Sequence, residues 1–180
     1  MLMKSDDSCL LVVDVQSKLA PVVAGSERVV ENTATLMKSA ARLGVPMLVS
    51  EQYPQGLGAT VDDLACLAPN DSVVEKVDFS CLGDAAFAER FDGLGRNQAV
   101  VAGMEAHVCV LQTAMHLIER GTDVYVVSDA VSSRQLGNAE MALERLRGAG
   151  AEVVTTEMVV FEWLGRAGTP EFKELSALIK

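Results

Sequence analysis

The chain of 180 residues is poor in aromatic side chains, in histidine and in basic charge. Aromatic residues make up 4% of it, and it holds two histidines. Its 15 Lys and Arg residues stand against 25 Asp and Glu residues, which gives a formal net charge of −10. This deficit of basic charge excludes nucleic acid and anionic membrane surfaces as partners, because both bind basic patches. With two histidines, a three-histidine zinc site is also excluded.

Long apolar runs are missing as well. No stretch approaches the ~18 uncharged apolar residues that a membrane-spanning helix requires. The N-terminal segment MLMKSDDSCLLVVDVQ has two aspartates ahead of its apolar run and no small-residue cleavage site after it, so we interpret it as a first strand rather than a signal peptide. The four cysteines show no C-x-x-C spacing, which favours free thiols and a cytoplasmic location. No G-x-G-x-x-G follows the first strand, and we expect no cofactor.

Short β-branched runs alternate with longer helical patterns along the whole chain. Strands are expected over residues 9–16, 45–52, 72–79, 98–104, 123–130 and 151–157, and helices over 26–44, 84–95, 107–121 and 138–150, with a helical tail after them. This alternation predicts βαβ units, in which helices cover both faces of a parallel sheet. A hydrophobic content of 49% fits such a three-layer α/β/α fold, and because no linker divides the chain we expect one domain over residues 1–180.

Polar side chains follow several of the predicted strands at the edge where open α/β sheets bind ligands. Asp14 ends the first strand, Lys76 lies in the third, and Cys109 follows the fourth after a short turn. A carboxylate, an ammonium group and a thiol at one edge form a nucleophile with two ionisable neighbours. The loop over residues 51–60, which is rich in turn-forming residues, is expected to shape a pocket beside them.

Each of these three residues also has an ordinary structural interpretation. Cys109 is expected in the first turn of a helix, where free N–H groups and the helix dipole favour a thiolate and can hold an oxyanion. A free cysteine is equally common as a small buried hydrophobic residue. Asp14 suits a turn or cap at the end of its strand, and alternation along its strand can point Lys76 to solvent. The residues alone leave these alternatives open.

Three segments resemble the isochorismatase-like cysteine hydrolase superfamily, in the order LLVVDVQ, EKVDFSCLGD and VAGMEAHVCVLQTAMHLIERGTDVYVVSDAVSSR. The segments SEQYPQGLGAT and TTEMVVFEWLGRAGTPEFKELSALIK resemble its branch of isochorismatase domain-containing proteins. The resemblance implies a six-stranded, mainly parallel sheet and a catalytic triad of Asp14 as base, Lys76 as positioning cation and Cys109 as nucleophile. It also implies a cis peptide bond between Met104 and Glu105, and an oxyanion hole made by the backbone N–H groups of Glu105 and Cys109.

The resemblance also narrows the chemistry. Family members that cleave the vinyl ether of isochorismate lack the nucleophilic cysteine, so its presence here favours acyl transfer at an amide-like C–N bond. The segment VSEQYP has neither the aspartate nor the histidine of the metal site that related nicotinamidases carry, so we expect no metal. We therefore predict a hydrolase of a small amide-like substrate that forms a covalent acyl-enzyme. The alternative is a catalytically weak or inactive oligomeric scaffold or binding protein on the same fold.

The substrate pocket is expected to draw on side chains near the three proposed catalytic residues. These side chains are Gln16, Gln52, Tyr53, Phe79 and His107. His107 is not expected to be the base, because residues two apart on a helix do not face each other. His116 and the other cysteines (Cys9, Cys66 and Cys81) are expected to be structural.

Members of the family form dimers or larger assemblies, so we expect a homo-oligomer that acts on a small molecule. The apolar tail around Phe161, Trp163 and Leu164 is a candidate contact between copies, and a helix that covers the core is its structural alternative.

Overall fold

The computed structural model describes residues 1–179, and its centre is a six-stranded sheet in which every pair of neighbouring strands is parallel. The strands are β1 (Ser8–Val13), β2 (Met47–Gln52), β3 (Val73–Lys76), β4 (Gln98–Met104), β5 (Asp123–Ser132) and β6 (Glu152–Val154). Their order in the sheet is β3-β2-β1-β4-β5-β6, so the direction of the connections reverses between β1 and β4. The predicted fold class is confirmed.

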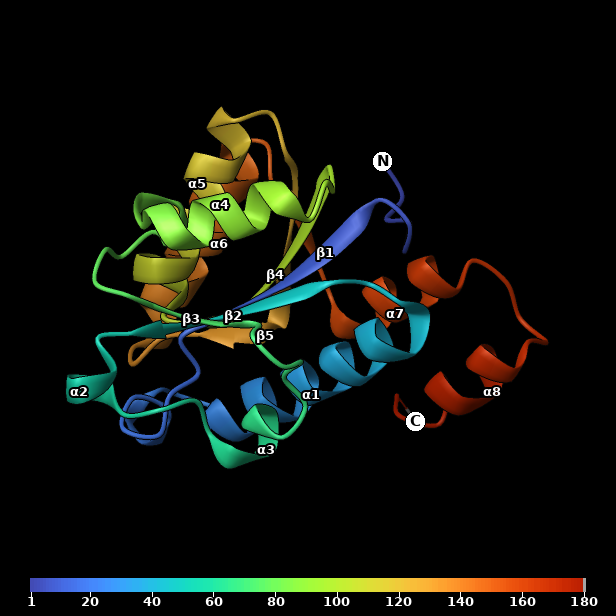
Figure 1. The fold of residues 1–180 in the computed structure, drawn as a ribbon, viewed down its shortest axis with the longest axis horizontal. Helices are drawn as coiled ribbons and strands as arrows, with labels where there is room; N and C mark the ends of the chain where they lie inside the picture. The colour runs from blue at the N-terminus through green and yellow to red at the C-terminus, as the bar shows by residue number, and fades with distance from the viewer. Residues whose placement is uncertain (180) are drawn as a thin grey trace.

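Helices cover both faces of the sheet (Figure 1). On one face lie α1 (Ser26–Leu43), α3 (Asp62–Ala65), α7 (Thr156–Leu164) and α8 (Pro170–Leu175), and on the other lie α4 (Ala85–Gly93), α5 (Leu111–Glu119) and α6 (Leu136–Gly148). Alternate residues of β1 supply the two cores, because successive side chains of a strand point to opposite faces. Leu10 and Val12 pack on the α1 side, while Leu11 and Val13 pack on the α4–α6 side.

Several element boundaries differ from those predicted. The first strand ends at Val13 rather than at residue 16, because Asp14 adopts a left-handed φ of 52° and the chain leaves the sheet there. The predicted helix over 107–121 begins with one π-helical turn, Ala106–Val110, before α5. Four one-turn elements were not predicted: the helices α2 (Pro54–Leu57) and α3, and the 3₁₀ turns Ala20–Val22 and Cys81–Gly83. Elements this short carry too little periodicity to stand out in a sequence.

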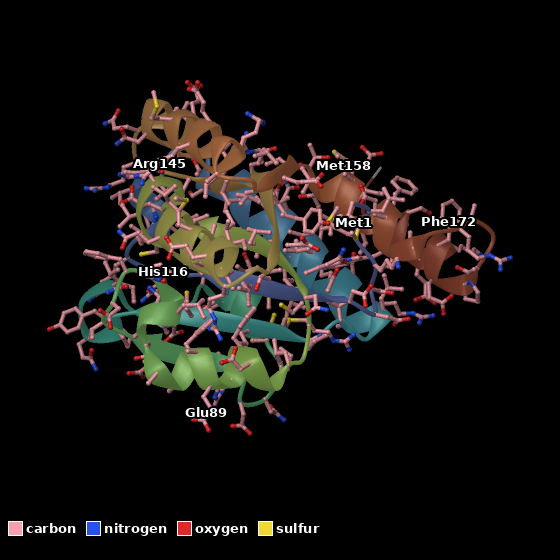
Figure 2. The ribbon with its side chains drawn as sticks, turned by 90° about the horizontal axis from the view of Figure 1, so that it is seen from above. Met1, Glu89, His116, Arg145, Met158 and Phe172 are labelled. Atoms are coloured by element: carbon pink, nitrogen blue, oxygen red, sulfur yellow. The ribbon has the colours of Figure 1, made fainter. Side chains whose placement is uncertain are left out.

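The helices α7 and α8 confirm the predicted helical tail. Figure 2 shows Met158 of α7 and Phe172 of α8 at the end of the molecule away from His116 of α5. Trp163 is buried and donates its indole N–H to the hydroxyl of Ser8 at the start of β1, 3.0 Å away. It therefore belongs to the core at the amino edge of the sheet. None of the helices described for residues 1–179 has both the length and the apolar content needed to cross a membrane.

Gly103 brings β1 and β4 unusually close at their carboxyl ends. It pairs with Val13 across the sheet and has a φ of +128°. A Cβ at this position would lie 2.0 Å from the carbonyl oxygen of Val13, a separation that no real side chain adopts. Only glycine fits here. The two segments that leave these strands, one carrying Asp14 and the other Cys109, therefore start from adjacent backbones.

Candidate active site

Asp14 and Lys76 form a fully buried ion pair at the carboxyl ends of β1 and β3. The Nζ atom of Lys76 lies 2.8 Å from Oδ2 of Asp14, and both side chains are 0% exposed. The same ammonium donates to Oε1 of Gln52 at 2.7 Å and to the carbonyl oxygens of Asp78 and Phe79, each at 3.2 Å. These partners compensate the loss of hydration that a buried charge suffers. The alternative in which Lys76 points to solvent is therefore wrong.

The second oxygen of the Asp14 carboxylate has its own donor. Ser50 of β2 donates its hydroxyl to Oδ1 of Asp14 at 2.6 Å, and the thiol of Cys81 lies 3.4 Å from that hydroxyl. Sequence reasoning missed Ser50. The available signal was a small polar residue directly after the apolar start of β2. In the structure, Ser50 pairs with Val13, the residue just before Asp14. Both carboxylate oxygens are thus held in place, which fixes the direction in which the carboxylate can act.

Cys109 and Asp14 line one cavity of about 320 Å³ at the carboxyl edge of the sheet. The other polar side chains around it are Lys18, Gln52, Glu105 and Arg134, and the apolar ones are Leu19, Val22, Leu57, Phe79 and Val108. The Sγ atom of Cys109 is 3.9 Å from Oε1 of Gln52, the amide oxygen that also accepts from Lys76. The cavity lies where the order of the strands reverses, which is where ligands bind in open α/β sheets.

The buried thiol of Cys109 has a pKa above its usual value. Burial raises its pKa, the nearby negative charge of Asp14 raises it further, and Lys76 only partly opposes them. The loss of hydration on burial therefore has a larger effect on the pKa of Cys109 than the free N–H groups at the start of the helix, which were expected to favour the thiolate. Burial lowers the pKa of Lys76, but the negative charge of Asp14 and the hydrogen bond to it outweigh burial and leave the pKa above its usual value. The arrangement is a neutral thiol beside a carboxylate that is itself bound to an ammonium group.

Two of the five expected pocket residues, Gln52 and Phe79, line this cavity, and the other three do not. Gln16 is fully buried and uses its amide to donate to the carbonyl oxygens of Gln52 and Gly58, so it holds the loop instead. Tyr53 adopts a φ of 38° and lines a separate hollow.

His107, the third of these, does not line the cavity. Its Nδ1 atom lies 2.9 Å from the hydroxyl of Ser133, and its Nε2 atom lies 3.5 Å from the side-chain nitrogen of Asn138. Its ring therefore belongs to the contact between the π-helical turn and α6.

The peptide bond between Met104 and Glu105 is cis, at the position that the resemblance implies. The carboxylate of Glu105 accepts from the backbone N–H of Arg134 at 2.9 Å and from its Nε at 3.1 Å. Partial burial raises the pKa of Glu105, but the hydrogen bonds and the charge of Arg134 outweigh it and hold the pKa below its usual value. Sequence reasoning had assigned a role only to the Glu105 backbone and none to Arg134.

We expect Glu105→Gln to remove a pH-dependent part of the stability. A carboxyl group whose pKa is lowered by folding stabilises the fold above its ordinary pKa of 4.5, and this contribution is lost as the pH falls through the lower folded value. The free energy of unfolding of the variant should fall below that of the wild type at neutral pH, and the difference should shrink on acidification. Urea titrations over this pH range measure it. A difference in the free energy of unfolding that does not change with pH would contradict the lowered pKa of Glu105.

Comparison with known proteins places this chain in a family. The model of the isochorismatase domain matches residues 8–158. The chain belongs to the isochorismatase family. It is 40% identical over 177 residues to the secreted isochorismatase effector Isc1 of Phytophthora sojae, covering 96% of this chain and 84% of that protein. It is 38% identical over 176 residues to isochorismatase domain-containing protein 2A of Mus musculus, covering 97% and 84%.

Solved structures of the isochorismatase fold agree with this assignment. The structure of MAR1 ribonuclease from Caenorhabditis elegans shares 35% identity and superimposes with a TM-score of 0.93, covering 99% of this chain and 92% of that one. The YcaC gene product of Escherichia coli, described as an octameric hydrolase of unknown specificity, shares 23% identity with a TM-score of 0.93, covering 99% and 90%. At that identity the likeness concerns the fold alone.

The remaining thiols of this isochorismatase-family protein differ in accessibility. Cys9 and Cys81 are buried, and burial raises the pKa of Cys9 to about 12 and of Cys81 to about 11. Cys66 is exposed, so it competes with Cys109 for thiol reagents. Within residues 1–179, no group of three or more His, Cys, Asp and Glu side chains is arranged to hold a metal ion.

Proposed function

We propose that this member of the isochorismatase family is a cysteine-dependent hydrolase of a small substrate with an amide-like C–N bond. The observation that carries the proposal is the shared cavity of Cys109 and Asp14, with Lys76 bound 2.8 Å from the same carboxylate. A neutral thiol needs a base at the moment of attack, and the carboxylate of Asp14 is suited to that role. The cavity of about 320 Å³ suits a small ligand.

The reaction has two steps. Asp14 removes the proton from Cys109 as the sulfur attacks the carbonyl carbon, and the carbonyl oxygen becomes an oxyanion that the backbone N–H groups of Glu105 and Cys109 stabilise. The C–N bond then breaks, and Asp14 gives its proton to the departing nitrogen, which leaves as ammonia or an amine. A water molecule that transfers a proton to Asp14 attacks the thioester, and the proton returns to sulfur as the acid leaves. Lys76 keeps the carboxylate oriented and balances its charge throughout.

We expect ammonia or amine release from at least one member of a panel of small amides, ureides and hydrazides. The same panel should yield a mass increase on Cys109 equal to the acyl group when the reaction is quenched early, since the acyl-enzyme is covalent. Peptide mass spectrometry locates the adduct, and Cys109→Ala is the control. The absence of turnover and of any adduct across the panel would favour the alternative, a scaffold or binding protein on this fold.

The net charge of −10 favours a small molecule over RNA as the substrate, because RNA binding needs clustered basic side chains. We therefore do not propose a ribonuclease activity for this chain on the basis of the name of the Caenorhabditis elegans protein.

We also propose that the chain forms a homo-oligomer, as the YcaC relative does. The exposed apolar side chains of Met158 and Phe161 on α7 support a contact there, whereas Trp163 is buried in its own chain. Light scattering measures the assembled mass. The cytoplasmic location stays a prediction.

A further inference from the structure

Arg134 presents an unused hydrogen-bonding edge beside the candidate active site. It follows β5 and lines the same cavity as Cys109, with its side chain 60% exposed. Glu105 binds the backbone N–H and the Nε of Arg134, so one edge of the guanidinium group is held. Among residues 1–179, no hydrogen bond engages Nη1 or Nη2. A planar group with two free donors and a fixed orientation is suited to pair with a carboxylate.

The charge balance of the cavity points in the same direction. The two acidic side chains that line it, Asp14 and Glu105, are each paired with a cation, Lys76 and Arg134 respectively. Lys18 also lines the cavity, is exposed and forms no ion pair within the described part of the chain. With Lys76 counted as the partner of Asp14, three cations stand against two carboxylates, which leaves one positive charge in excess at the cavity of a chain whose formal net charge is −10. The overall composition does not explain a local excess of the opposite sign, whereas an anionic ligand does.

We propose that the substrate carries a carboxylate group, which the Nη atoms of Arg134 and the ammonium group of Lys18 bind while its amide-like carbonyl lies at Cys109. This inference rests on the proposed function and names its substrate class. The apolar side chains of the cavity, such as Leu19 and Leu57, then contact a short aliphatic spacer between the two groups. A monoamide of a short dicarboxylic acid, such as succinamate, has this chemistry.

Two alkylating reagents of similar size, one anionic and one neutral, measure whether the cavity prefers a negatively charged ligand. Iodoacetate and iodoacetamide alkylate a thiol by the same substitution, and the ratio of their rates at one thiol does not depend on how much thiolate is present. We expect the ratio of iodoacetate to iodoacetamide at Cys109 to exceed that of a neutral cysteine amide about tenfold, because charge-assisted hydrogen bonds are worth about that factor. The measurement uses the Cys66→Ser variant and peptide mass spectrometry, so that the exposed thiol does not consume reagent.

Three variants distinguish a specific carboxylate-binding site from a general effect of the net charge of the protein. Lys18→Gln removes the unpaired cation, and Arg134→Lys keeps the charge but loses the planar pair of donors, so each should lower the ratio several-fold. The exposed Arg166, between α7 and α8, provides the matched control: Arg166→Gln changes the net charge equally and should leave the ratio unchanged. A ratio at Cys109 equal to that of the neutral reference, or one that Lys18→Gln does not lower, would overturn the inference.

A binding measurement separates this inference from the proposed function. If neither reagent modifies Cys109, the proposed nucleophile is unavailable and the proposed function fails. The charge preference is then decided with Cys109→Ala, which needs no reactive thiol, by calorimetric titration with succinamate and with the neutral succinamide. Binding of succinamate about tenfold tighter supports the carboxylate site. Equal affinities, or binding of neither compound, overturn it.

Discussion

Cys109→Ala is expected to lower kcat by at least about a thousandfold on any amide that the protein hydrolyses. The alanine side chain cannot form the acyl-enzyme. Cys109 is the only thiol that lines the cavity within the described chain, since Cys9 and Cys81 are buried in the core and Cys66 is exposed elsewhere on the surface. Ammonia release under saturating substrate measures the effect.

Two further variants sharpen this test. Cys109→Ser should be nearly as inactive as the alanine variant, because a hydroxyl group loses its proton less readily than a thiol and burial adds to that difficulty. Cys66→Ser, which also removes a thiol, should leave kcat unchanged, since Cys66 lies in a separate hollow against α1. Turnover that survives Cys109→Ala would exclude Cys109 as the nucleophile.

Lys76→Met is expected to abolish activity and to destabilise the fold by about 3–5 kcal/mol, because it leaves the carboxylate of Asp14 buried without its cation. Urea unfolding measures the loss of stability, and the amide assay measures turnover. In the wild type, the raised pKa of Lys76 means that its stabilising charge is fully present below its ordinary pKa of 10.5 and is lost as the pH rises through the higher folded value.

The double variant Asp14→Asn/Lys76→Met separates stability from catalysis. It removes both charges together, so it should recover part of the lost stability without any activity. A single Lys76→Met variant as stable as the wild type would show that Asp14 does not depend on this ammonium group. Full activity in that variant would exclude Lys76 from the site.

Much of the fold was predictable because strand patterns and helical patterns alternate along the whole chain. The strand over 98–104 was predicted at its observed bounds, since its apolar run follows a predicted helix that ends in glycine and stops at Glu105. Asp14, Lys76 and Cys109 were proposed as site residues because polar residues that interrupt or end apolar strands stand out against their neighbours. What brings them together, the glycine at 103 with no room for a side chain, depends on a partner strand far away in the sequence.

The rest of the site was not predictable for reasons of geometry. Lys18 and Arg134 lie in connections that follow strands. Such connections lack the side-chain periodicity of helices and strands, so the sequence does not indicate whether a side chain points into the cavity or to solvent. Tyr53 was expected in the pocket, but its left-handed backbone redirects the side chain, and such a conformation in a residue other than glycine has no local signal. Burial raises the pKa of Cys109, and nothing in the sequence indicated this effect because burial depends on the packed structure rather than on position along a helix.

Lys76 belongs to the strand at one margin of the sheet, which is four residues long and hydrogen-bonded along one side only, to β2. Such marginal strands detach in local openings that need far less free energy than global unfolding. An opening of β3 would separate the ammonium group of Lys76 from the carboxylate of Asp14 while the central strands stay paired. We therefore expect any catalytic activity to be lost in mild denaturant before the sheet structure is lost, because the proposed site depends on one of the two short edge strands of the sheet.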